Sequence, residues 1–245
     1  MNIFSGGDAE QLTGWRHDAY QQFKQRMLDP QQPFPCIFGV EAVVRSTLRY
    51  AFVDDAAGQA HGLAAALSDF TQVSASLGKR TSLVCFFESW SQERSHEAYH
   101  DHFWDLLRQV SALDVQEWPQ GISADTDDPS FEWAFGGEPM FVVVNTDLHE
   151  KRRSRAFDRV AITFQPRFVF DDIAAGTVKG DEARRLIRAR LSDYDDAPVT
   201  PLLGSFGDDA NREWQQYYLD DGQDVAALRT CPVTGFRALA TEGVS

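Results

Sequence analysis

The sequence predicts an α+β protein of one domain, in which helices flank a mixed, largely antiparallel sheet. Helical and strand-like segments interleave along a chain of 245 residues, a length that suits one large domain. In mid-chain, FEWAF and MFVVVN read as two strands joined across the turn GGEP. A hairpin at this place favours a mixed sheet over a doubly wound parallel one. We therefore expect a single domain over residues 1–245.

The first half of the chain alternates helical and extended patterns. Residues 8–28 predict an N-terminal helix, because Trp15, Ala19, Phe23 and Met27 recur every fourth position, and the prolines of DPQQPFP end it. The segments LRYAFV and TSLVCFF read as strands. Two further helices are expected at residues 61–77 and 92–110, each with one apolar face.

The second half begins with a polar connection, WPQGISADTDDPS, whose length is typical of functional loops. The hairpin follows, and RVAITFQPRFVF predicts one more strand. Residues 181–192 predict an amphipathic helix, and we expect another at 208–220.

Composition narrows the possible functions. The formal net charge of -14 argues against nonspecific binding to nucleic acid or to anionic membranes. The chain lacks an apolar run of the roughly 18 residues that a membrane helix needs, and its first residues lack a secretory signal, so the cytoplasm is the expected location. Three cysteines without close spacing do not indicate a disulfide framework, and glycine-rich phosphate loops are absent.

The segment HEAYH matches the HExxH pattern of zinc enzymes. On a helix, His96 and His100 share a face, and Glu97 is placed to act as a general base. No third ligand follows in a recognisable context, and short patterns also arise by chance. A zinc or di-iron enzyme stays an alternative, and we expect these histidines at the surface or in a supporting role.

The segment NTDLHEKRRSR is a dense cationic run in an acidic chain. If Asn145 or Thr146 caps a short helix, Arg152 and Arg153 lie on the same face as His149. That arrangement offers an imidazole to a metal and guanidinium groups to carboxylates or phosphates. A solvated basic turn is the ordinary interpretation of such a run.

Several segments together resemble the YqcI/YcgG family of bacterial proteins. They are FPCIFG with LRYAF, FEWAFGGEPMFVVVNTDLHEKRRSR, ITFQPRFVFD and GDDANREWQQYYL. The resemblance implies a haem-dependent N-oxygenase that binds haem b and uses dioxygen or peroxide as oxidant. Its substrate would be a small guanidine, amine or aminoazole in natural-product biosynthesis, such as arginine, or 2-aminoimidazole that is converted to a nitro product.

The resemblance also implies site residues. His149 is the expected axial ligand of the iron, because it heads the most distinctive matching segment, and Cys36 is the rival ligand. Arg152, Arg153 and Arg155 are expected to bind the haem propionates.

Three further residues complete the expected site. Arg167 is another candidate for a propionate. Glu138 is the expected catalytic carboxylate that receives a cationic substrate, and Asp125 is a second candidate for that role. An electron donor is the expected partner, a homodimer stays open, and a haem-binding sensor without turnover is a further alternative.

Overall fold

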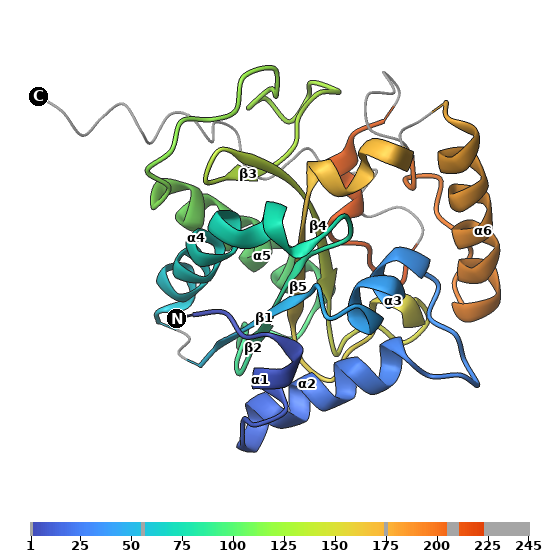
Figure 1. Ribbon diagram of the computed structural model, residues 1–245, viewed down its shortest axis with the longest axis horizontal. Coiled ribbons are helices and arrows are strands. Elements are labelled where there is room, and N and C mark those ends of the chain that lie inside the picture. Colours follow the sequence, from blue (N-terminus) through green and yellow to red (C-terminus); the bar gives the residue numbers. More distant parts are fainter. Residues whose placement is uncertain (1, 55–56, 174–175, 205–210, 223–245) are drawn as a thin grey trace, which may run out of the picture.

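The computed structural model describes residues 2–54, 57–173, 176–204 and 211–222. Five strands form one mixed sheet in the order β1-β2-β5-β4-β3, with helices packed against it (Figure 1). The α+β prediction is confirmed. None of the helices in these ranges is long and apolar enough to cross a membrane.

The sheet has one parallel pair of strands and is otherwise antiparallel. Strand β1 (Arg49–Val53) runs parallel to β2 (Leu83–Phe87), and β5 (Ala161–Pro166) runs antiparallel to β2. Strand β4 (Glu138–Asn145) pairs with β5 and with the short edge strand β3 (Ala134–Phe135). Gly136 and Gly137 both have positive φ, as the tight turn between β3 and β4 requires. The predicted hairpin is confirmed.

Helices α4 (Gln59–Leu77) and α5 (His96–Ala112) cover one face of the sheet (Figure 1). Alternate strand residues point into this core, because successive side chains of a strand face opposite sides. The strand residues that face α4 and α5 include Val53, Leu83, Cys85, Val142, Val144, Ile162 and Phe164.

The opposite face is covered in two parts. Helices α1 (Gly6–Ala9), α2 (Gly14–Met27) and α3 (Ile37–Val44) lie against β1 and β2, where Tyr50 and Phe86 belong to a second, smaller core. Helix α6 (Val178–Tyr194) stands farther from the sheet, on the side of β4 and β5 (Figure 1). The single helix expected at 8–28 is thus two helices, with Gly14 at φ +61 where the second begins.

Three local expectations differ from the structure. The run after Pro166 forms a 3-10 helix, η2 (Arg167–Ile173), rather than more strand, and Pro166 has no N–H to continue the pairing. A helix does not start at Thr146, and the basic segment instead holds a 3-10 turn, η1 (Arg153–Arg155). Of the helix expected at 208–220, the described part contains only η3 (Glu213–Gln216), and residues 208–210 lie outside the described ranges.

Candidate functional site

A cavity of about 530 Å³ lies between the sheet and α6. This volume falls within the range of about 300–1,000 Å³ that is typical of small-molecule and cofactor sites. Phe141, Val143 and Gln165 form its floor, and they alternate with the strand residues that face the core. Ala183, Ile187 and Leu191 of α6 form the opposite wall, at the four-residue spacing that places side chains on one helix face.

Cys36 lies in the cavity wall and caps the N-terminus of α3. Its Sγ accepts a hydrogen bond from the backbone N–H of Gly39 at 3.4 Å. Burial raises the pKa of the Cys36 thiol, whereas the N–H groups of Gly39 and Phe38 and the charges of Arg155 and Arg80 oppose that rise. N–H donors and cations therefore act on the sulfur atom of a residue that lines the cavity.

Two arginines of the basic segment also line the cavity. Arg152 is 4% exposed and Arg155 is 8% exposed. Arg155 donates to the carbonyl oxygens of Tyr217 at 3.1 Å and Gln216 at 3.0 Å, and Arg152 Nε donates to that of Asp220 at 2.8 Å. Among the described residues, neither guanidinium forms an ion pair with a carboxylate, and burial followed by the charge of Arg152 lowers the pKa of Arg155 to about 10.

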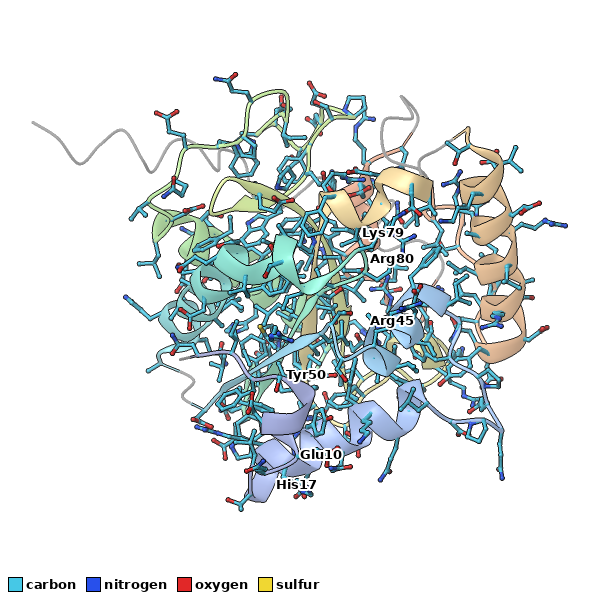
Figure 2. All side chains as sticks on the ribbon, viewed as in Figure 1. Glu10, His17, Arg45, Tyr50, Lys79 and Arg80 are labelled. Atoms are coloured by element: carbon cyan, nitrogen blue, oxygen red, sulfur yellow. The ribbon has the colours of Figure 1, made fainter. Side chains whose placement is uncertain are left out.

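A third buried arginine, Arg80, comes from the loop before β2. Figure 2 labels it between η2 and α3, next to Lys79. Its Nη2 pairs with Asp172 at 2.7 Å, its Nη1 donates to the carbonyl oxygen of Val169, and its guanidinium lies 4.5 Å from the ring centroid of Phe38. Arg80 lines the cavity, and its buried Nε has no hydrogen-bond partner among the described residues.

The structure places Arg153 elsewhere. Arg153 is absent from the cavity lining, and its guanidinium lies 5.3 Å from the ring centroid of Tyr194. Of the three arginines expected at the propionates, the structure brings Arg152 and Arg155 to the cavity and turns Arg153 towards α6.

His149 is buried behind the cavity wall rather than in it. Its Nε2 lies 2.5 Å from the carbonyl oxygen of Leu219, and its Nδ1 lies 2.8 Å from Oγ1 of Thr146. Burial lowers the pKa of His149 to about 4. Thr146 does not cap a helix, and its Oγ1 accepts from the N–H of Leu148 in a turn. Both ring nitrogens of His149 are therefore engaged, and its role as an iron ligand stays a prediction.

Two carboxyl groups and one guanidinium form a buried cluster at the cavity wall. Arg167 donates from Nε to Oε2 of Glu132 at 2.7 Å, from Nη2 to Oε1 of the same residue, and from Nη2 to Oε1 of Glu213 at 2.8 Å. Arg167 and Glu213 line the cavity, whereas Glu132 lies behind them and is 0% exposed. Burial, with the charge of Glu213 adding to it, raises the pKa of Glu132 to about 9.

The two carboxylates expected to receive a substrate lie outside the cavity lining. Glu138 begins β4, and burial raises its pKa. Asp125 is exposed in the long polar loop and accepts from the N–H of Asp127 at 3.0 Å. Both roles stay predictions.

The histidines of HEAYH lie on α5 beside His149, and the ring centroids of His96 and His149 are 4.9 Å apart. His96 Nδ1 lies 2.9 Å from the hydroxyl of Tyr218, and His100 Nε2 accepts from the indole N–H of Trp104 at 3.2 Å. Of the two expected placements, at the surface or in a supporting role, burial leaves only the supporting role for His100. Within the described ranges, three or more His, Cys, Asp or Glu side chains do not gather anywhere in a way that could hold a metal ion.

Sequence reasoning missed Glu132, Glu213 and Arg80. Glu132 did carry a signal, because a charged residue inside the apolar run FEWAF must be either exposed or paired when the run is buried. The role of the other two depends on partners more than thirty residues away along the chain.

The sequence profile of the YqcI/YcgG family matches residues 23–234. YcgG of Bacillus subtilis (strain 168) is 41% identical over 228 residues, which cover 91% of this chain and 89% of that protein. YqcI of the same organism is 38% identical over 228 residues, which again cover 91% of this chain and 89% of that protein. A Streptomyces lavendulae protein named "Putative N(omega)-hydroxy-L-arginine synthase DcsA" is 32% identical over 233 residues, 92% of this chain and 86% of its own length. No solved structure matches.

Proposed function

The chain belongs to the YqcI/YcgG family, and we propose that it is a haem-dependent N-oxygenase. In this proposal, it hydroxylates or further oxidises the nitrogen of a small guanidine, amine or aminoazole. The relative named as an N(omega)-hydroxy-L-arginine synthase supports N-oxygenation as the reaction type. The resemblance of the whole chain to the family supports haem b as the cofactor.

The observation that carries the proposal is the donor set of the cavity. Its floor and its α6 wall are largely apolar, which suits a flat macrocycle. Cys36 offers a soft sulfur ligand for iron at the wall. Arg152 and Arg155 are buried cations without carboxylate partners among the described residues, and bound propionates would satisfy them. The residues present therefore fit the cofactor.

Between the two candidate ligands, we propose Cys36. Cys36 belongs to the cavity lining, whereas His149 lies outside it and both its ring nitrogens are bound to neighbouring oxygens. An iron bond to His149 would have to replace one of these hydrogen bonds and move a buried ring. A thiolate ligand donates electron density that favours O–O cleavage when the haem is bound, and this suits an oxygenase.

The proposed reaction needs an oxidant, and the lining residues of the cavity keep water away from it. Hydroxylation by dioxygen places one oxygen atom in an N–H bond and reduces the other to water, with electrons and protons that a separate donor supplies. Peroxide as oxidant needs no such donor. Apolar residues such as Phe141 and Ile187 exclude bulk water, which strengthens electrostatic contacts inside the cavity.

The first experiment tests the cofactor and its ligand. Protein purified from cells with ample iron is expected to show a Soret band and a pyridine haemochromogen. Cys36→Ala is expected to abolish or shift that band. Cys85→Ala, which removes a buried thiol on the core side of β2, and His149→Gln are expected to keep it. Loss of the native spectrum in His149→Gln, with Cys36→Ala unchanged, would move the ligand to the histidine.

The second experiment tests turnover. Haem-loaded protein is incubated with arginine or 2-aminoimidazole and either peroxide or a reductant with oxygen, and N-hydroxylated or nitro products are measured by mass spectrometry. A product that needs the haem supports the oxygenase. Haem binding without any product from guanidine, amine or aminoazole substrates would leave a sensor as the better description.

A further inference from the structure

The cluster of Glu132, Arg167 and Glu213 has one carboxyl group more than it has guanidinium groups. Within the cluster, Arg167 reaches both carboxyl groups, and Glu132 also hydrogen-bonds with Glu213. Burial, and then the charge of Glu213, raise the pKa of Glu132, which favours the protonated form of this carboxyl group. The cluster can therefore accept one further positive charge if that proton is released.

The position of Glu213 makes it accessible to a ligand. It is 6% exposed and lines the cavity together with Arg167, while Glu132 lies behind both. Two aromatic rings, Phe141 and Phe170, line the same cavity and contact each other edge to face at 6.1 Å. A planar cation beside Glu213 would thus meet a carboxylate and aromatic side chains, the two groups that favour guanidinium binding.

The other carboxylates of the cavity lining are less suited. Asp195 already accepts from the N–H of Ser154 at 2.6 Å and from its hydroxyl at 2.9 Å. Asp171 is exposed at the rim, where water screens its charge. Glu213 is the buried carboxylate of this lining within the described ranges, and a buried carboxylate acts on a bound cation through a lower dielectric.

We propose that Glu213 binds the cationic nitrogen group of the substrate, a guanidinium, amidinium or aminoazolium ion, while Arg167 and Glu132 hold its carboxylate in place. This inference rests on the proposed function, because it names the charge class of the substrate in the same cavity. It assigns the recognition role to Glu213 rather than to Glu138.

The test compares two ligands that differ in charge at the relevant group. Arginine carries a guanidinium, and citrulline has a neutral urea of nearly the same shape. Dissociation constants of both are measured by calorimetry on the haem-loaded protein, on Glu213→Gln and on Glu88→Gln. Glu88 is an exposed carboxylate just after β2 that does not line the cavity, so its variant controls for the loss of one charge.

The wild-type protein is expected to prefer arginine over citrulline. In Glu213→Gln that preference should fall about tenfold to a hundredfold, the size expected for a lost hydrogen bond to a charged group. In Glu88→Gln the preference should not change. Absence of a preference in the wild type, or its survival in Glu213→Gln, would overturn the inference.

Two further variants keep the test decisive. Glu213→Asp retains the negative charge next to Arg167, so this variant replaces Glu213→Gln in the test if Glu213→Gln does not fold. The shorter side chain of aspartate should weaken arginine binding but not citrulline binding. Unchanged arginine binding in Glu213→Asp would count against the proposal. A loss of preference in Glu138→Gln alone would assign recognition to that residue.

The haem spectrum of the same preparations separates the two proposals. Haem without a charge preference would contradict only the role of Glu213. A charge preference in protein that binds no haem would contradict only the proposed cofactor.

Discussion

Protonation of His149 should destabilise the fold. The carbonyl oxygen of Leu219 can only accept, so the neutral ring carries its proton on Nε2, and Nδ1 accepts from the hydroxyl of Thr146. A second proton on Nδ1 would place a positive charge in a buried site, where desolvation and also the charge of Arg155 disfavour it. The ring is 5% exposed, so water does not stabilise the added charge.

The size of the effect follows from the two pKa values. In the unfolded chain the pKa of a histidine is about 6.5, and in the folded protein burial lowers that of His149 to about 4. A depressed histidine pKa contributes stability that is present above pH 6.5 and is lost as the pH falls towards 4. Between pH 7 and pH 5 the free energy of unfolding should therefore fall by about 2 kcal/mol from this residue.

Urea unfolding at pH 7 and pH 5 measures this contribution. His149→Gln should be less stable than the wild type at pH 7, and the difference should shrink by about 2 kcal/mol at pH 5, because glutamine does not titrate. His61→Gln, at an exposed position of α4, is the matched control and should follow the wild type at both pH values. Parallel pH dependence of the wild type and His149→Gln would refute the reasoning.

Two further outcomes are expected. Asp221 accepts from the N–H groups of Glu150 at 2.6 Å, Lys151 at 3.0 Å and Arg152 at 2.7 Å, so Asp221→Asn should lower the free energy of unfolding by about 2 kcal/mol in urea titrations. An unchanged urea midpoint would show that these contacts contribute little. Glu132 has a raised pKa, so its contribution is complete below pH 4.5 and is lost as the pH rises towards 9. The wild type should therefore lose stability relative to Glu132→Gln between pH 6 and pH 8, and a constant difference in thermal unfolding would contradict this.

The elements that sequence periodicity predicted well are those whose pattern is local. The apolar face of residues 61–77 becomes the buried face of α4, and the apolar run TSLVCFF contains β2, which is buried on both faces. The turn GGEP required positive φ at two glycines, and this is a property of adjacent residues. Prediction failed after Pro166, where the missing N–H of proline ends the strand pairing, and after Thr146, where the chain binds distant partners.

In the candidate site too, some residues could be selected from the sequence and others could not, because their positions depend on distant partners. The resemblance selected Cys36, Arg152, Arg155 and Arg167, and all four line the cavity. It did not select Glu213, whose position depends on Arg167, forty-six residues earlier in the chain. His149 attracted attention as the head of a cationic run, but in the fold it bonds with Leu219, seventy residues later.

The sequence by itself determined the α+β class, the strands and helices with regular apolar spacing, and the family, because these follow from short-range patterns and from matching segments. Only the tertiary structure decided which charged side chains line the cavity and which charged side chains form hydrogen bonds inside the protein. The basic segment illustrates the reason. Its arginines bind backbone carbonyls of residues 216–220, and its backbone N–H groups bind Asp221. A run of basic residues in the sequence shows how many cations are present. Their partners, their burial and the direction of their side chains depend on segments that meet only when the chain folds.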